Sequence, residues 1–385
     1  MANRAAAAFY AAQLPRVERA VNYLRARGIE AAAGSWWQPG YAPGNWTALL
    51  DHLLGHGFTA DDLVEAGLAR LTRSGRLVDY LRDRVVFPIH DLYGEVIGFT
   101  GRDMSRRSST PKYLNTPTTP VYRKSDALFG LGPQLARRDP RDRRPLRAVI
   151  VEGAADAIAV HRMAHDHDEN LISAALCGIM LTESHIELLA AALPPGTPLT
   201  VVLDGDDAGR KAYERWLPQL NRWTSTVEVA TLPDGADPAD LLAAHGPAEA
   251  LRMILDRVQP SVVAHLSRIL DRLLDHPLDL AEPETRLLIW RAVTPCFRQA
   301  PDLAHNLGTL AATRLGLPLA EVMTGVVNQI GVPPEESAAR PRARRPRSAS
   351  KPRRIRPLRV VPTTPPSPYA RALEAFRSAQ WRRAA

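Results

Sequence analysis

The residues whose types and spacing most directly suggest chemistry lie in the segment 201–209, which reads Val-Val-Leu-Asp-Gly-Asp-Asp-Ala-Gly. Three apolar residues lead into Asp204 and Asp206, and an extended backbone places side chains at positions i and i+2 on the same side. Two carboxylates held side by side repel each other, so the pair predicts either bound divalent cations or helix caps. Gly205 would leave room for a phosphate, and Gly209 would allow a tight entry into a helix.

Two further acidic loops also follow apolar stretches. One reads Glu152-Gly153-Ala154-Ala155-Asp156, and the other reads Asp237-Pro238-Ala239-Asp240. Helix capping does not require three acidic loops at one place, whereas a hard divalent cation needs several oxygen ligands. If the loops share one edge of a sheet, a divalent-metal site is therefore the better prediction.

The elements that would position these loops alternate between strands and helices. Strand-like stretches cover 146–151, 171–176, 199–203 and 226–232, and helical stretches begin near Ala155, Glu183 and Ala208. This alternation predicts a parallel sheet covered by helices on both faces. Chemistry in such sheets lies at the carboxyl ends of the strands, where all three acidic loops fall.

The region before residue 146 differs in pattern. Helical spacing from Phe9 to Leu24 predicts one helix that Gly28 would stop, and Thr59 is placed to cap another. Short apolar runs over 84–89 and 95–99, joined by Asp-Leu-Tyr-Gly, predict a hairpin. A proline at position 88 indicates an edge strand or a bulge.

Basic and aromatic residues are interleaved in this same region. A phosphate-tracking surface and an ordinary solvated strand face both fit that composition. The aromatic residues Trp36, Trp37, Tyr41 and Trp46 could stack on bases or simply belong to the core. The basic residues are Arg84, Arg102, Lys112 and Lys124, with Tyr113 and Tyr122 among them.

Length and composition limit the class of protein. A chain of 385 residues suggests two or three domains. The two cysteines, Cys177 and Cys296, exclude a disulfide framework and a cysteine-rich zinc site. There is no run of eighteen apolar residues and no Gly-Lys-Ser/Thr phosphate loop, so we expect no membrane span and no ATP-driven helicase. A cytoplasmic location is the expectation.

The C-terminal third divides into a helical part and a basic tail. Leucine spacing over 251–330 predicts helices, while 333–368 is rich in Pro, Arg and Ser and predicts disorder. Residues 340–359 contain ten Arg or Lys and no acid, and subtracting them from the net charge of +8 leaves −2. The tail would bind a polyanion such as nucleic acid, or serve as a solubilising linker. A short amphipathic helix is expected over 369–376.

Taken together, these motifs resemble a known family. The sequences Glu-Gly-x-x-Asp, Asp-x-Asp-x-x-Gly and Asp-Pro after successive strands are similar to the Toprim fold of bacterial primases, topoisomerases and some nucleases. Upstream, DYLRDRVVFPIHDLYGEVIGFTGRDM and PKYLNTPTTPVYRKSDALFGL resemble the N-terminal part of the RNA-polymerase core of bacterial DnaG-type primases. FYAAQL, GYAPGNW and GFTADDLVEAGL fit the same family, and the resemblance covers roughly residues 5–330.

The resemblance implies a fold of several subdomains that combines α/β and α+β architecture. A central Toprim domain with a Rossmann-like parallel sheet would occupy 146–245. An α+β subdomain carrying a basic ridge would occupy 1–145, and a helical bundle would occupy 246–332. A disordered basic tail with a short terminal helix would occupy 333–385.

The resemblance also implies site roles. Asp204 and Asp206 would hold divalent metals, Glu152 would act as general base or organise the metals, and Asp156 and Asp237 would support them. Magnesium suits this role, with manganese as the alternative, and zinc is not expected. The ridge residues Arg84, Arg102, Lys112 and Lys124 would guide the template strand and the nucleotides.

The implied activity is synthesis of short RNA primers on single-stranded DNA from ribonucleoside triphosphates. Family members carry a zinc-binding module and a helicase-binding domain that have no counterpart in this sequence, so a separate zinc-module protein or a replicative helicase is a candidate partner. The implied location is the cytoplasm, at the nucleoid. Within the motifs, Ala154 and Ala155 replace an aromatic residue and a methionine, and Ala239 replaces a second acid.

Two other classes of function fit part of the pattern. One is a Toprim nuclease or topoisomerase, which would leave the primase-like upstream segment unexplained. The other is a non-catalytic accessory factor that binds single-stranded DNA in replication and keeps the fold.

Overall fold

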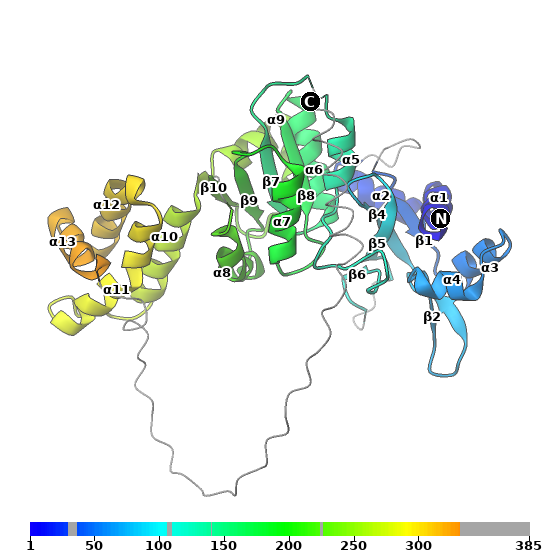
Figure 1. Ribbon diagram of the computed structural model, residues 1–385, viewed down its shortest axis with the longest axis horizontal. Coiled ribbons are helices and arrows are strands. Elements are labelled where there is room, and N and C mark those ends of the chain that lie inside the picture. The colour runs from blue at the N-terminus through cyan, green and yellow to red at the C-terminus, as the bar shows by residue number, and fades with distance from the viewer. Residues whose placement is uncertain (30–36, 106–109, 140, 224–225, 332–385) are drawn as a thin grey trace, which may run out of the picture. The chain divides into compact units, whose positions relative to one another are not determined.

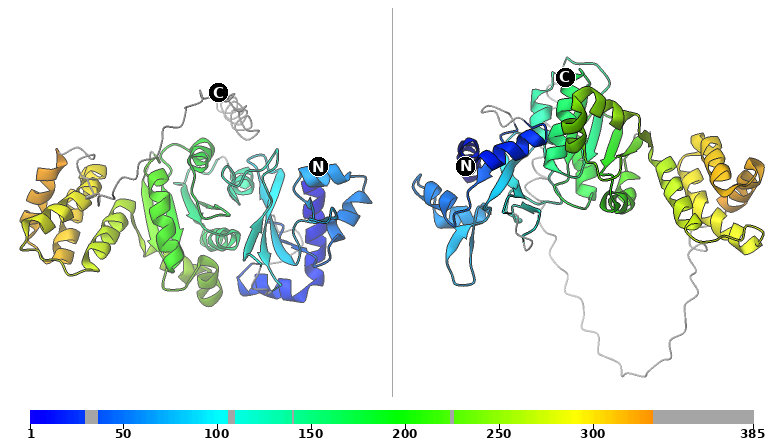
Figure 2. Two further views of the ribbon diagram at one scale, coloured as in Figure 1. Left: turned by 90° about the horizontal axis from the view of Figure 1, so that it is seen from below. Right: turned by 180° about the vertical axis from the view of Figure 1, so that it is seen from behind.

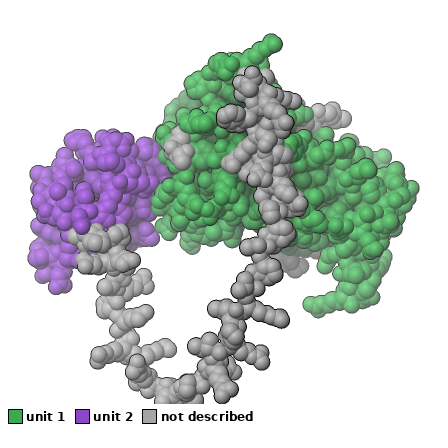
Figure 3. All heavy atoms as spheres, in the orientation of Figure 1, with its two compact units in different colours: residues 1–258, 366–385 green, residues 259–365 purple. Residues whose placement is uncertain are grey.

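The computed structural model describes residues 1–29, 37–105, 110–139, 141–223 and 226–331. The chain forms two compact units, one that reaches Val258 and one that begins at Gln259 (Figure 3). The predicted tail, 333–385, lies outside the described residues. Each unit is considered by itself below.

The first unit opens with short helices. A single helix up to Gly28 was the wrong expectation, because Pro15 lacks an N–H group and its ring clashes with the preceding turn. The helix breaks there into a 3-10 turn, η1. Thr59 caps α4 as predicted, in a capping box with Asp62. The helices are α1 (Ala2–Gln13), η1 (Leu14–Arg16), α2 (Glu18–Ala26), α3 (Ala48–Leu54) and α4 (Ala60–Glu65).

An antiparallel sheet follows, with the strand order β1-β4-β5-β6. The predicted hairpin is confirmed, since β4 pairs antiparallel with β5 across a turn in which Gly94 has a φ of 84°. Pro88 lies beyond the part of β4 that pairs with β1 and next to a bulge at Ile89/His90, so its missing N–H costs no ladder bond there. The strands are β1 (Gly40–Ala42), β2 (Ala69–Leu71), β3 (Leu77–Asp79), β4 (Arg84–His90), β5 (Val96–Asp103) and β6 (Tyr113–Asn115), of which β2 and β3 form a separate hairpin.

After α5 (Leu131–Arg137), the chain builds a five-stranded sheet in the order β11-β10-β9-β7-β8 (Figure 1). The pairs β7–β8, β7–β9 and β9–β10 are parallel, which confirms the predicted sheet. Every residue of β9 is buried, so this strand reads as a continuous apolar run. The three-residue β11 was not predicted. The strands are β7 (Arg147–Val151), β8 (Leu171–Ala175), β9 (Leu199–Leu203), β10 (Val227–Thr231) and β11 (Val258–Pro260).

Helices connect and cover these strands (Figures 1 and 2). They are α6 (Ala154–Asp166), α7 (Glu183–Ala192), α8 (Asp207–Leu220) and α9 (Pro238–Leu255). Buried side chains of α6 and α9 share one core with residues that precede the parallel sheet, including Leu24 of α2, Trp37 and Phe87 of β4. The four-stranded and the five-stranded sheets of the first unit are therefore joined by a continuous apolar core.

The second unit is helical, as the leucine spacing predicted. Its core gathers Leu266, Leu270, Trp290 and Val326, among others. The helices are α10 (Ser261–Leu274), α11 (Pro283–Gln299), η2 (Pro301–Leu303), α12 (Ala304–Leu315) and α13 (Leu319–Ile330). In the described part of the chain no single helix qualifies as a membrane span by length and composition, while 301–315 and 319–330, bent by 117°, do so only as a pair.

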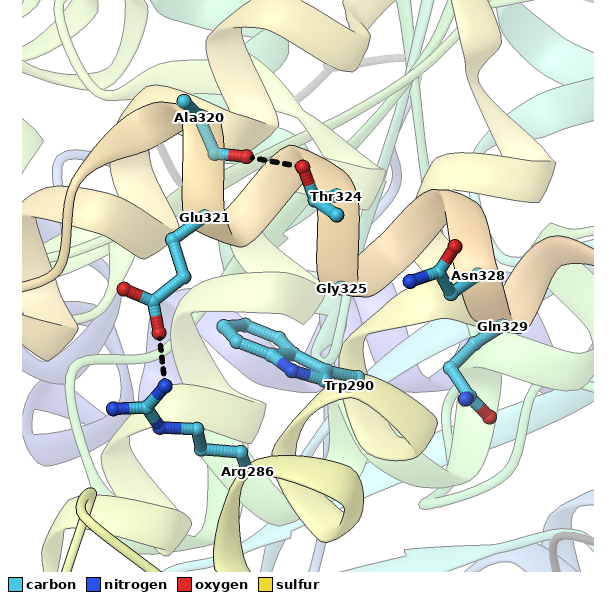
Figure 4. A pocket seen from close by; sticks show the side chains of 8 residues that line it. All are labelled: Arg286, Trp290, Ala320, Glu321, Thr324, Gly325, Asn328 and Gln329. Carbon is cyan, nitrogen blue, oxygen red and sulfur yellow. Dashed lines mark hydrogen bonds and ion pairs between the residues drawn. The ribbon is translucent and has the colours of Figure 1, made fainter. Parts of the chain in front are cut away.

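A surface pocket of about 520 Å³ lies between α11 and α13 of this unit (Figure 4). Trp290 forms its floor against Gly325, and Arg286 pairs with Glu321 at a distance of 2.7 Å on one side. Two amides, Asn328 and Gln329, line the other side.

The boundary predicted between 245 and 246 falls at a kink in α9, where Gly246 has a φ of 75°. The compact units divide later, between Val258 and Gln259. The division of the chain into four segments stays a prediction.

Candidate active site

Three adjacent strands of the parallel sheet bring the acidic loops to one edge. The strands β10, β9 and β7 lie side by side and run parallel, so their carboxyl ends meet. Glu152 directly follows β7, Asp204 directly follows β9, and Asp237 comes after β10. The predicted meeting of the acidic loops at one edge follows from this topology.

Two of the acids also cap helices. The Asp206 side chain accepts a hydrogen bond from the Gly209 N–H at 2.7 Å and caps α8. The Asp237 side chain accepts one from the Asp240 N–H at 2.7 Å and caps α9. Helix capping, one of the two sequence interpretations, therefore applies to these acids, and in each case it occupies a single carboxylate oxygen.

The two glycines of the central motif allow close approach of neighbouring backbone segments. A Cβ atom on Gly205 would lie 1.7 Å from the carbonyl oxygen of Pro233, and the Gly205 N–H donates to the Ala236 carbonyl at 3.0 Å. The prediction that Gly205 leaves room for a phosphate is therefore wrong, because the neighbouring loop fills that space. Gly209 does allow the tight helix entry, since a Cβ there would lie 2.4 Å from the carbonyl oxygen of Asp204.

Several carboxylate oxygens at this edge are buried and have no hydrogen-bond partner among the residues that the structure describes. They are Glu152 Oε1, Asp156 Oδ1 and Asp204 Oδ1. Asp156 is only 6% exposed. Buried polar atoms in proteins almost always have a hydrogen-bond partner, and a carboxylate can accept but not donate. These oxygens therefore fit the position of a bound cation.

The acids also raise the pKa values of one another. Burial, and then the charges of Glu152, Asp237 and Asp206, raises the pKa of Asp204 to about 7. Burial followed by the Asp206 charge raises the pKa of Glu152. Burial, and then Asp237 and Asp204, raises the pKa of Asp156 well above its usual value. A cation among these groups would reverse such shifts by favouring the ionised forms.

Two basic side chains oppose this repulsion. Lys112 lowers the pKa values of both Glu152 and Asp204, so its ammonium group lies within electrostatic range of both carboxylates. Arg215 on α8 lowers the pKa of Glu152. Lys112 was among the predicted residues, whereas Arg215 was missed. Arg215 lies eight residues after Asp207 on α8. The sequence alone does not show that this part of the helix faces Glu152, and only the folded structure reveals it.

Within the described residues, no three His, Cys, Asp or Glu side chains are grouped so that they could hold a cation by themselves. Magnesium usually keeps water ligands and takes one or two carboxylates together with substrate phosphates. An open set of acids is compatible with that mode of binding. The oxygens of Glu152 and Asp204 that have no partner among the described residues suit this way of binding magnesium.

Asp237 has a second partner that the sequence did not indicate. The Arg27 guanidinium donates from Nη1 to Asp237 Oδ2 at 2.5 Å and lies 3.7 Å from Asp240 Oδ1. Both side chains of the closer pair are largely buried, with exposed fractions of 20% and 17%. Both oxygens of Asp237 are thus engaged by protein groups, and α2 is tied to the start of α9.

Arg84 lies inside the protein, where it was expected on a surface ridge. Its side chain is 4% exposed, and Nη1 donates to the carbonyl oxygens of Gly101 and Pro111 at 3.0 and 3.1 Å. The Asp103 carboxylate lies 3.6 Å away. Arg84 is therefore buried and held by backbone carbonyls instead of lying on an exposed ridge, although it also lines a surface groove of the first unit, and its role in binding nucleic acid stays a prediction.

The other predicted basic residues are more accessible. The Arg102 guanidinium carbon lies 5.4 Å from the centre of the Tyr113 ring and 5.9 Å from that of Tyr23. Lys112 and Lys124 are exposed. A role for these three residues in binding nucleic acid stays a prediction.

The chain matches two family models. Residues 9–134 match the N-terminal domain of the DNA primase catalytic core, and residues 149–242 match a Toprim-like domain. Toprim domains of primases generally use divalent metal ions. The first of these matches covers the upstream segment that a nuclease or topoisomerase would leave unexplained.

Similar proteins agree with these matches. A DNA primase of Mycobacterium tuberculosis is 35% identical over 308 residues, which make up 78% of this chain and 46% of that protein. The chain thus spans about half the length of such a relative. The solved RNA polymerase domain of M. tuberculosis primase DnaG is similar with a TM-score of 0.63 and 32% identity, over 77% of this chain and 92% of that domain.

A DnaG primase catalytic domain solved with single-stranded DNA is also similar, with a TM-score of 0.62 and 29% identity over 82% of this chain and 95% of that one. Nearly the whole M. tuberculosis polymerase domain has a counterpart here at more than 30% identity. The family resemblance read from the sequence is confirmed, and the chain belongs to the family of DnaG-type primase catalytic cores.

Proposed function

We propose that this chain synthesises short RNA primers on single-stranded DNA by joining ribonucleoside triphosphates. The observation that carries the proposal is the set of buried carboxylate oxygens on Glu152, Asp156 and Asp204, at the carboxyl edge of a Toprim sheet, that have no partner in the described part of the chain. Nucleotidyl transfer places negative charge on phosphate oxygens, and acids that lack partners can share cations with those oxygens.

Asp204 and Asp206 would hold magnesium, or manganese in its place, together with Glu152. When bound, the metal would stabilise the charge that develops on the transferred phosphate and on the leaving pyrophosphate. Glu152 would accept a proton from the attacking 3′-hydroxyl, since a carboxylate within hydrogen-bond reach can act as a general base. Asp156 and Asp237 would support the three metal-binding acids. The hydrogen bond from Arg27 fixes the Asp237 side chain.

A groove of about 460 Å³ in the first unit offers a path for the template. Trp46 is 51% exposed there, and the Arg82 guanidinium carbon lies 3.6 Å from the centre of its ring. The two acids of the groove are paired, Asp83 with Arg19 at 2.5 Å and Asp103 with Arg84. A positive groove with an exposed aromatic side chain suits single-stranded nucleic acid.

The finer expectations about partners also belong to this proposal. A separate zinc-module protein and a replicative helicase are the candidate partners, and magnesium without zinc is the expected metal content. The location would be the cytoplasm, at the nucleoid.

The test is a priming assay with single-stranded DNA, ribonucleotides and Mg²⁺ or Mn²⁺. We expect short RNA from the wild type and a loss of at least about 100-fold in rate for Asp204→Asn, because one charge at the metal position is removed. The matched control is Asp275→Asn, which changes an exposed aspartate at the end of α10. It should leave the rate unchanged.

Two outcomes would overturn the proposal. No RNA with either metal, together with retained binding of single-stranded DNA, would favour a non-catalytic accessory factor. Cleavage of DNA without nucleotides would favour a nuclease.

A further inference from the structure

The loop that joins β8 to α7, residues 176–182, is held against two other elements. The Leu176 N–H donates at 3.3 Å to the carbonyl oxygen of Val151, the last residue of β7. The Trp216 indole N–H, on α8, donates at 3.0 Å to the carbonyl oxygen of Ile179. These contacts fix the path of the loop beside two elements that position acids of the candidate active site.

A turn near the start of this loop presents Gly178. The preceding residue, Cys177, has a φ of 51°, which is uncommon for a residue with a side chain. The Asn115 side-chain amide, on β6, donates to the Cys177 carbonyl at 2.5 Å and holds this conformation. The φ of Gly178 itself lies outside the left-handed range that favours glycine, so its missing side chain needs another explanation.

That explanation is the side chain of Lys124, which lies across Gly178. A Cβ atom at position 178 would come within 2.2 Å of Lys124 Cε, 3.0 Å of its Nζ and 3.5 Å of its Cδ. Apart from the adjoining residues, the three heavy atoms nearest to that point all belong to this lysine. The absent side chain therefore leaves a slot at position 178, and the lysine stem lies in it.

The backbone of Lys124 is fixed as well. The buried ring of His185 lies with Nε2 3.1 Å from the Lys124 carbonyl oxygen, and because a carbonyl can only accept, Nε2 carries the hydrogen. The other ring nitrogen, Nδ1, accepts from the Thr182 N–H at 3.2 Å. The Thr182 hydroxyl donates to the Ser125 carbonyl at 2.5 Å. Both the backbone and the stem of the lysine are thus held by residues 178–185.

The charge of the lysine is left available. Lys124 is exposed and forms no ion pair within the part of the chain that the structure describes. The nearby acids are engaged elsewhere, since Asp126 accepts a hydrogen bond from the Ser125 hydroxyl and Glu183 pairs with Arg222. Packing against the loop, and not an ion pair, therefore sets the position of the ammonium group.

We propose that Gly178 is a positioning residue, whose slot confines the Lys124 stem and so holds the ammonium group ready for a phosphate. A lysine side chain loses rotamer freedom when its ammonium group is fixed on a ligand, and a stem that is already confined loses less. The phosphate contact rests on the proposed function, whereas the confinement is a property of the free chain.

The confinement is tested by NMR without DNA or nucleotides. The full chain labelled with [ε-¹³C]lysine gives one Cε signal for each of its four lysines. These are Lys112, Lys124, Lys211 and Lys351. The signal lost in Lys124→Ala identifies that residue. Gly178→Ala should shift this signal toward that of a freely rotating lysine and leave the other three in place. Gly331→Ala, where a Cβ would meet nothing within 4 Å, is the control and should shift none.

The consequence for function is tested by coupling. Lys124→Ala shows which phosphate the ammonium group meets, by raising either the Kd for single-stranded DNA or the KM for ribonucleotides. Gly178→Ala should raise the same quantity about fivefold, because the released stem loses more freedom on binding. In a chain that already carries Lys124→Ala, it should raise that quantity no further. The thermal midpoint should stay unchanged, since only the flexible end of a side chain has to move.

Three outcomes separate the possibilities. The positioning role is overturned if the Lys124 signal stays in place in folded Gly178→Ala. It is also overturned if Gly178→Ala acts equally with and without the lysine. A signal that moves while DNA affinity and ribonucleotide KM remain those of the wild type would confirm the slot and refute the phosphate contact, so a failure of the proposed function appears separately.

Discussion

At the scale of single residues, the meeting of the acids at one edge of the sheet was predictable and their protein partners were not. Asp204 and Asp206 lie two positions apart after an apolar run, so their shared placement follows from strand geometry alone. Arg27 meets Asp237 from 210 positions away, and no local pattern indicates such a pair. The burial of Arg84 was missed because a buried guanidinium and an exposed one look alike in a sequence.

The pair between Arg27 and Asp237 is open to measurement. Arg27→Met should lower the free energy of unfolding by about 2 kcal/mol, since a largely buried carboxylate loses its cationic partner. Arg25→Met, at an exposed position of the same helix, is the control and should change stability little. In a double-mutant cycle with Asp237→Asn, additive effects would show that the two residues do not interact.

At the scale of elements, long periodic segments were predicted well and short or interrupted ones were not. Four of the five strands of the Toprim sheet were placed to within one residue at each end, because β7, β8 and β9 are largely buried runs and β10 alternates apolar and polar residues. The three-residue β11 carries too few residues for any period to appear. The helix before Gly28 broke at Pro15, where a proline overrides favourable spacing.

The contact between α11 and α13 gives a prediction at this scale. A Cβ atom on Gly325 would lie 2.4 Å from the ring of Trp290, and the indole cannot yield as a flexible chain would. Gly325→Ala should therefore destabilise the helical unit by about 2 kcal/mol in urea unfolding. At Gly331 a Cβ would meet nothing within 4 Å, so Gly331→Ala is the control. Equal stability of the two variants would contradict the packing described.

At the scale of the whole molecule, the family and the overall fold were predictable because local motifs of several elements agreed. The division into two compact units was harder to predict. The helix α9 continues through the predicted boundary at 245/246 with only a kink, and the units divide after Val258. The tail lies outside the described residues, so its expected role rests on its composition alone.

The tail prediction concerns DNA affinity. A chain that ends at residue 332 loses the ten basic residues of 340–359. It should bind single-stranded DNA more weakly, with a flatter dependence of affinity on salt, because fewer counterions are released. Unchanged affinity at every salt concentration would favour the solubilising role of the tail.

The stability of the molecule should also depend on pH through buried histidine. Burial lowers the pKa of His185, which is 1% exposed, to about 4. The unfolded chain then binds a proton near pH 6.5 that the folded chain takes up only near pH 4, so acidification through that range favours unfolding. Between pH 7 and pH 5 this residue should cost about 2 kcal/mol of stability.

His185→Gln should remove that part of the pH dependence in urea unfolding at pH 5 and pH 7. His305→Gln, at an exposed position on α12, should not. An identical pH dependence in wild type and His185→Gln would refute the assignment.

The capping roles of Asp206 and Asp237 have a consequence for mutagenesis. Each of these side chains begins a helix as well as bearing charge, so alanine at either position removes a cap worth about 1 kcal/mol along with the carboxylate. If an alanine variant is inactive, the loss of activity could therefore come from a damaged helix or from the missing carboxylate. Asparagine keeps the oxygen that caps the helix and deletes only the charge. Scans of this edge with asparagine and alanine in parallel would separate the residues that serve the reaction from those that only hold the loops.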